Sequence, residues 1–198
     1  KEATSVAVDS SDIVFVFNRG TIPVIVFDSE GKVINTWGEW MFITPQAITI
    51  TPNDEVFCVD VGEHTVKKFT KTEELLMVIG TSGTSAQSMS GKPFAKPTHV
   101  PEDQNTKEFY VTDGYSNARI HKYSPEGDLL FSWGESGTGE GQFNIVHNIV
   151  VDANGWVYVG DRENHRIQVF DNKGKYETQW VNMSKTAALH IFTKNILN

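Results

Sequence analysis

The sequence predicts an all-β fold, a β-propeller of four blades, because one strand–turn–strand unit recurs at a nearly constant period. The clearest unit runs from Trp156 to Phe170. Its residues 156–159 are aromatic or β-branched, residues 161–164 form a polar turn, and Ile167 restarts an apolar strand. One such hairpin cannot bury its own apolar face, so it needs copies of itself.

The chain supplies three copies upstream, starting at Val14, Val56 and Phe109. The aromatic residues that close the four hairpins are Phe27, Phe69, Tyr123 and Phe170, at spacings of 42, 54 and 47 residues. A short apolar strand precedes each hairpin, at residues 6–8, 47–50, 98–100 and 148–151. A further strand follows each one and ends near Trp37, Ile79, Trp133 and Trp180. Four strands in a period of about 40–50 residues indicate propeller blades of four strands each.

The predicted blades occupy about residues 5–40, 46–80, 97–134 and 147–181 of a single domain that spans residues 1–198. The tail, residues 182–198, begins like the inner strand of a fifth blade and then stops. It either completes the first blade or leaves an open edge, which favours self-association with a second chain.

Residues that recur in every blade are expected to be structural, because a catalytic group is needed only once. One position holds a small polar residue in all four hairpins, where it is expected to fix a turn: Asn18, Asp60, Asp113 and Asp161. On the same argument Trp37, Trp133 and Trp180 are predicted to be core residues.

Composition excludes several classes of partner. The net charge is −8 and the pI is about 5.2, which argues against nucleic acid, because phosphate binding needs clustered Lys and Arg. No apolar run approaches the roughly 20 residues of a membrane span. The single cysteine, Cys58, excludes internal disulfides. The chain starts at Lys1 rather than Met, which favours a processed or trimmed product.

Four stretches carry a family resemblance, and the match runs from about Val6 to Trp180. They are residues 15–20 (FVFNRG), 112–120 (TDGYSNARI), 139–148 (GEGQF through VHN) and 161–168 (DRENHRIQ). The units resemble NHL repeats. More narrowly, these stretches resemble the peptidyl-α-hydroxyglycine α-amidating lyases and their microbial relatives.

This resemblance implies a six-bladed propeller with zinc on its axis. Of the three zinc-binding histidines that it implies, His147 matches one, Gln46 stands at the place of another, and the third lies in a blade that this chain lacks. A Gln amide would bind zinc less well than His does. The family's catalytic arginine and tyrosine map onto Arg19 and Tyr115. A structural calcium would use the carbonyl groups of Val6 and Ile48, and its carboxylate ligand is missing. A secreted or extracytoplasmic location follows from the resemblance alone.

Each candidate residue also has a structural interpretation. His147 is either a metal ligand or a hydrogen-bonded histidine at a strand start, and His99 is displaced by one residue from the equivalent position, because Thr98 aligns with Gln46. Arg19 either grips a substrate carboxylate or pairs with an acid of a neighbouring blade. Tyr115 is either the base that takes a hydroxyl proton or an aromatic lid.

Two functions follow. The first is a lyase-like protein that splits a C–N bond to give a peptide amide and glyoxylate, with zinc as Lewis acid. The alternative is a non-catalytic module that binds a small peptide-like ligand or a protein on its ring face. A third function, a sugar or lactone hydrolase, would need several channel carboxylates around calcium.

Overall fold

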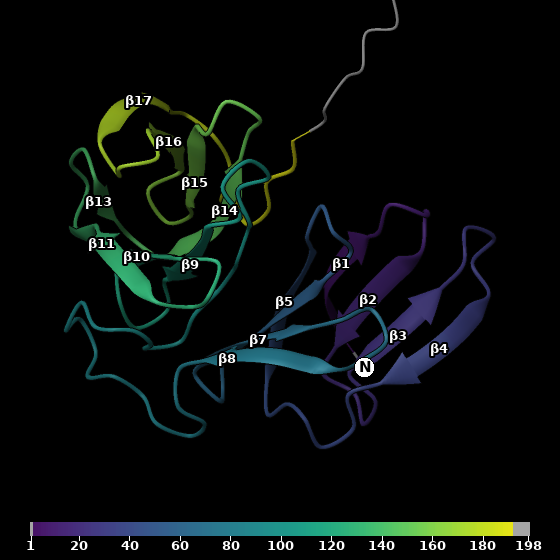
Figure 1. The fold of residues 1–198 in the computed structure, drawn as a ribbon. Coiled ribbons are helices and arrows are strands. Elements are labelled where there is room, and N and C mark those ends of the chain that lie inside the picture. Colours follow the sequence, from purple (N-terminus) through teal and green to yellow (C-terminus); the bar gives the residue numbers. More distant parts are fainter. Residues whose placement is uncertain (1, 192–198) are drawn as a thin grey trace, which may run out of the picture.

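Four antiparallel sheets follow one another along the chain as the blades of a β-propeller, in a computed structural model that describes residues 2–191 (Figure 1). The first blade contains β1 (Ala3–Val8), β2 (Val14–Asn18), β3 (Val24–Phe27) and β4 (Val33–Trp37). The second contains β5 (Pro45–Ile50), β6 (Val56–Asp60), β7 (Thr65–Phe69) and β8 (Leu75–Ile79). The fourth contains β14 (Val146–Val151), β15 (Val157–Asp161), β16 (Arg166–Phe170) and β17 (Tyr176–Trp180). The predicted all-β propeller is confirmed.

The third blade differs from the prediction of four strands. It contains β9 (Phe109–Asp113), β10 (Arg119–Tyr123) and β11 (Leu129–Trp133). The strand expected at residues 98–100 is reduced to isolated bridges from His99 to Thr112 and from Glu102 to Phe109. Pro97 and Pro101 flank this segment, and a proline cannot donate a backbone hydrogen bond to the ladder. A short parallel pair, β12 (Glu135–Ser136) and β13 (Gln142–Phe143), lies in the loop that leads to the fourth blade.

Three hydrophobic clusters hold the blades together, one at each junction between successive blades. Val24, Trp37 and Phe69 belong to the cluster between the first and second blades, and Phe57 and Tyr123 to the next. The third cluster, between the third and fourth blades, includes Ile149, Val159 and Phe170. Burial of a side chain of this size stabilises the fold by roughly 1.5–3 kcal/mol, so these interfaces dominate the stability of the propeller.

The closing aromatics and the outer-strand aromatics face opposite neighbours. Phe69, Tyr123 and Phe170 each pack against the preceding blade, whereas Trp37 and Trp133 pack against the following one. At the two ends of the described chain these partners are not present. Phe27 is therefore only half-buried and Trp180 is 51% exposed. The prediction that Trp180 is a core residue is wrong within residues 2–191, because no blade covers its face there.

The recurring polar residue of each hairpin has the structural role that the sequence predicts. Asp60 accepts backbone hydrogen bonds from the incoming loop at Ile43 and Thr44 and from its own turn at Gly62. Asp113 and Asp161 accept in the same way from the loops that lead to their blades. These three aspartates therefore tie the second, third and fourth blades to the chain that enters them, whereas Asn18 bonds within its own turn, to Gly20 and Pro23. None of the described residues forms a helix that could cross a membrane.

Candidate functional site

The candidate site lies at the end of the propeller where the inner strands begin. The turns between the second and third strands of each blade lie at the same end, because adjacent strands are antiparallel. The inner strands β1, β5 and β14 each contain a register irregularity, at Thr4, Gln46 and His147 respectively. A β-bulge re-aims the side chain of the extra residue, and here it turns Gln46 and His147 toward the channel.

Tyr115 reaches His147 because the turn that carries it packs against the backbone of β14. A Cβ atom added to Gly114 would lie 1.7 Å from the carbonyl oxygen of Val146, so only glycine permits this approach. Val146 is the residue before His147, and the rings of Tyr115 and His147 meet edge to face at 5.5 Å between centroids.

A continuous hydrogen-bonded chain joins four side chains that the sequence singled out. Arg19 Nη2 donates to Gln46 Oε1 at 3.2 Å, and Gln46 Nε2 donates to the Tyr115 hydroxyl at 3.2 Å. The Tyr115 hydroxyl lies 2.9 Å from His147 Nε2. His147 Nδ1 lies 2.9 Å from the carbonyl oxygen of Ala187, in the tail. The structure thus brings together Arg19, Gln46, Tyr115 and His147.

The two ends of this chain, together with a neutral His147, fix the direction of every hydrogen bond. A guanidinium group only donates and a carbonyl oxygen only accepts. His147 Nδ1 must therefore carry the proton donated to Ala187, which leaves Nε2 as the acceptor for the hydroxyl of Tyr115. Burial lowers the pKa of His147, against the hydrogen bond to Ala187, which raises it, and nearby Arg162 lowers it further. His147 is consequently a neutral base beside a phenol.

Arg162 is a site residue that the sequence reasoning missed. Its guanidinium carbon lies 5.8 Å from the centre of the Tyr115 ring, within the range of a cation–π contact. A signal was present in the sequence: Arg162 directly follows Asp161, as Arg19 directly follows Asn18 at the same position of the first hairpin. The two arginines thus come from equivalent turns of the first and fourth blades.

Gln46 and His147 line a channel cavity of about 570 Å³ together with Thr98, His99 and Ala187. His99 forms a hydrogen bond with the Ile149 backbone, and its Nδ1 is buried without a partner among the described residues. Burial, together with the nearby His147, lowers the pKa of His99 to about 4. His99 is thus a neutral histidine in the channel wall, next to the bonded chain.

The geometry bears on the alternatives for Arg19. Within residues 2–191 its guanidinium forms no ion pair with an acid, and it donates instead to the Pro45 carbonyl oxygen and to Gln46. Arg19 is exposed at the mouth of the channel. The interpretation that it pairs with an acid of a neighbouring blade is therefore wrong for the described chain.

The described residues do not by themselves fit a zinc ion. Both ring nitrogens of His147 are engaged, one with Tyr115 and one with Ala187. Gln46 offers only a neutral amide, and its Oε1 already accepts from Arg19. Residues 2–191 contain no group of three or more His, Cys, Asp or Glu that could hold a metal ion. Val6 and Ile48, the expected calcium ligands, line the same cavity, and Ser5 Oγ donates to the Ile48 carbonyl oxygen at 3.3 Å.

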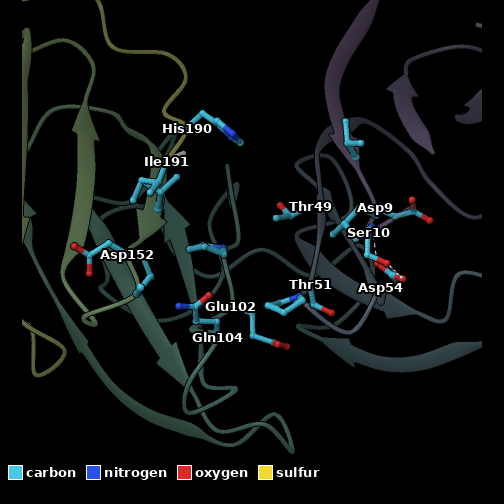
Figure 2. Close-up of a pocket in the computed structure, with 17 residues that line it drawn as sticks. Asp9, Ser10, Thr49, Thr51, Asp54, Glu102, Gln104, Asp152, His190 and Ile191 are labelled. Atoms are coloured by element: carbon cyan, nitrogen blue, oxygen red, sulfur yellow. Dashed lines mark hydrogen bonds between the residues drawn. The ribbon is translucent and has the colours of Figure 1, made fainter. Parts of the chain in front are cut away.

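A second cavity, of about 440 Å³, lies where the inner strands end, and Figure 2 shows residues that line it. Carboxylates line it, but they already serve the protein's own structure. Asp54 accepts from Ser10 at 2.7 Å (Figure 2). Asp152 accepts from the hydroxyl of Tyr158 at 3.2 Å. Glu102 forms ion pairs with Lys68 and Lys107. This end of the described channel therefore does not provide the calcium-centred carboxylates that a propeller hydrolase would need.

Replacing Tyr115 with Phe is expected to leave folding nearly intact. The change removes two hydrogen bonds, to Gln46 and His147, at a half-buried place that water can reach. The free energy of unfolding should fall by less than about 1.5 kcal/mol. Urea unfolding of both proteins measures this, and a loss of several kcal/mol would instead make Tyr115 a packing residue.

Comparison with known proteins agrees with this fold. The NHL repeat family model matches residues 143–170, in the fourth blade. NHL repeat-containing protein 3 of Mus musculus is 38% identical over 190 residues, which cover 89% of this chain and 54% of that protein. Peptidyl-alpha-hydroxyglycine alpha-amidating lyase 1 of Drosophila melanogaster is 37% identical over 162 residues, which cover 77% of this chain and 30% of that protein.

Solved structures resemble the chain in fold. The structure of a streptogramin B lyase superposes with a TM-score of 0.69 at 11% identity, covering 90% of this chain and 54% of that one. At this identity the likeness shows the propeller fold alone. The chain spans about half the length of the NHL repeat-containing protein that it matches, and less of the lyase.

Proposed function

We propose that this NHL-repeat β-propeller, a homologue of the amidating lyases and of NHL repeat-containing proteins, binds peptide-like ligands by a terminal carboxylate at Arg19. The observation that carries the proposal is the exposed guanidinium of Arg19, which has no acidic partner within residues 2–191 and opens onto the channel mouth. A guanidinium presents a planar fork of donors that matches a carboxylate.

The ligand would lie along the bonded chain. With its carboxylate at Arg19, the neighbouring amide or hydroxyl group would face Gln46 and Tyr115, which supply both donors and acceptors. Arg162 contacts the Tyr115 ring but its Nε is already paired with Glu163 at 2.9 Å, so the cation available to a ligand here is Arg19. The site therefore favours small anionic ligands, although the net charge of the whole chain is −8.

A second candidate function is cleavage of a peptidyl-α-hydroxyglycine, which the Tyr115–His147 hydrogen bond favours. The α-hydroxyl proton would pass to the Tyr115 oxygen as the phenol proton passes to His147 Nε2. The electron pair of the hydroxyl would form the carbonyl of glyoxylate while the C–N bond breaks. The departing nitrogen would take a proton from water, which gives the peptide amide, and the hydroxide that remains would take the proton from His147 and so restore its neutral form.

Calorimetric titration with hippurate tests the binding proposal. An Arg19→Gln variant should bind hippurate at least about tenfold more weakly, because a hydrogen bond to a charged group contributes about 1.5–3 kcal/mol. Lys32→Gln is a matched control, since it removes one positive charge from an exposed turn at the opposite end of the blade. Equal affinity of wild type and Arg19→Gln would exclude Arg19 as the carboxylate site.

Glyoxylate release from α-hydroxyhippurate separates the two functions. Release that is lost in Tyr115→Phe, while hippurate binding persists, would support cleavage at this site. Repeating the assay with added zinc and then with a chelator tests whether the reaction depends on metal. Tight hippurate binding without glyoxylate release would leave the binding function alone.

A further inference from the structure

The loop between β4 and β5 presents large apolar side chains to solvent at the same end of the propeller as Arg19. Trp40 is 91% exposed, Met41 is 44% exposed and Ile43 is 65% exposed. We refer to these three residues as the apolar ridge. Ile22, in the turn that also carries Arg19, is 41% exposed. Apolar side chains that gather beside a polar site typically mark an interaction surface.

The ridge is held by the residue at its centre and by its backbone. The ring of Phe42 packs edge to face on Phe17, with 4.9 Å between ring centroids, and it also contacts Trp37 and Phe69. The Asp60 carboxylate accepts hydrogen bonds from the backbone N–H groups of two successive residues, Ile43 at 2.5 Å and Thr44 at 2.9 Å. Its exposed side chains are therefore presented by an anchored loop.

The other contacts of the loop strengthen this anchoring. Lys67 Nζ donates to the carbonyl oxygen of Met41 at 2.5 Å. Trp40 itself has a φ of 64°, which is uncommon for a residue other than glycine. The chain thus keeps a bulky indole in a costly backbone conformation at the outer tip of the loop, where it contributes little to the core.

The ridge is directly continuous with the Arg19 site. Arg19 Nε donates to the carbonyl oxygen of Pro45 at 3.2 Å, and its Nη2 donates to Gln46. Pro45 comes only two residues after Ile43, a distance of at most about 7 Å along an extended chain. The backbone of Ile43 thus lies within about two residue lengths of the backbone carbonyl group that Arg19 contacts.

We infer that the apolar ridge binds an apolar side chain of a peptide whose terminal carboxylate is held by Arg19. This inference rests on the proposed function. It adds a preference for an apolar residue one or two positions before the C-terminal residue of the peptide, which is glycine in the test ligands below. An extended peptide rises about 3.4 Å per residue, so such a side chain would reach the loop at Ile43, where Trp40 is also exposed. The indole offers a large, rigid contact area to it.

Two ligands and three variants test the inference. N-acetylglycine carries the carboxylate alone, and N-acetyl-phenylalanyl-glycine adds one apolar side chain. Trp40→Ser should bind the second ligand about tenfold more weakly and the first with unchanged affinity. Leu75→Ser is the matched control, because Leu75 is 52% exposed but lies at the start of β8, at the other end of its blade. Arg19→Gln should weaken both ligands.

The outcomes separate this inference from the proposed function. If Trp40→Ser leaves both affinities unchanged while Arg19→Gln weakens them, the ridge has no part in binding and the carboxylate site stands. If Trp40→Ser weakens only the longer ligand and Arg19→Gln has no effect, the ridge binds the apolar side chain but Arg19 does not hold the carboxylate. That result overturns the proposed function and, with it, the inference. Failure of both ligands to bind the wild type overturns both. Thermal melts of each variant check that the fold is intact. A separate outcome would also overturn the inference: wild type that binds neutral lipid vesicles through Trp40 and does not bind the longer peptide.

Discussion

Replacing Phe170 with Ala should lower the free energy of unfolding by about 3–5 kcal/mol. The side chain is fully buried between the third and fourth blades. Its ring lies 5.9 Å from the ring centroids of both Trp133 and Phe143, and 6.1 Å from that of Tyr176. Truncation leaves a cavity that these rigid strands cannot close. Because a domain is stable by only about 5–15 kcal/mol, the loss is a large share of the total.

Phe27→Ala is the matched control for this prediction. Phe27 closes the hairpin of the first blade as Phe170 closes that of the fourth, but no preceding blade covers it within residues 2–191, and it is half-buried. Its truncation should cost less than about 2 kcal/mol, because less apolar surface returns to water. Urea unfolding monitored by circular dichroism measures both variants. Equal losses would show that some further surface packs on Phe27.

The repeat made the fold predictable from local patterns. Alternating apolar residues located the strands, and recurrence of Asp60, Asp113 and Asp161 at one position identified residues that fix turns. Trp180 occupies the same repeat position as buried Trp37 yet is half exposed. Repetition specifies the position of a residue within its own blade, whereas its burial depends on the neighbouring blade.

The site was predictable only in part. Family resemblance pointed to Arg19, Gln46, Tyr115 and His147, and the structure joins all four by hydrogen bonds. The contact of His147 with Ala187 was not predictable, because the sequence predicts that the tail begins as an inner strand, whereas its described residues 182–191 form no strand and Ala187 meets His147 from 40 positions away.

The close approach at Gly114 was likewise hidden. It depends on the backbone of Val146 in the next blade, and no local sequence pattern encodes such a contact. Arg162 was missed for another reason. Its equivalence to Arg19 is visible in the repeat, but its place beside Tyr115 follows only from the way the blades curve around the channel. Local pattern thus identified the residues, and packing between blades decided which of them meet.

The same packing makes the channel sensitive to acid. His99 has a folded-state pKa of about 4 against an ordinary value of 6.5, because burial and the neighbouring His147 disfavour its charged form. The unfolded chain therefore binds the proton more readily than the folded chain does. The stability that neutral His99 contributes is fully present above about pH 6.5 and is lost as the pH falls toward 4. The lowered pKa of His147 acts in the same direction.

We expect the wild type to lose about 2 kcal/mol of unfolding free energy through His99 between about pH 7.5 and about pH 5. A His99→Gln variant removes the titrating group, so its stability should change by about that much less over the same range. His165→Asn, which replaces an exposed histidine, should keep the full dependence of the wild type. Urea unfolding of the three proteins at both pH values makes the comparison. If His99→Gln keeps the full dependence, other groups carry the acid sensitivity and the histidine in the channel wall is already free to take up a proton in the folded state.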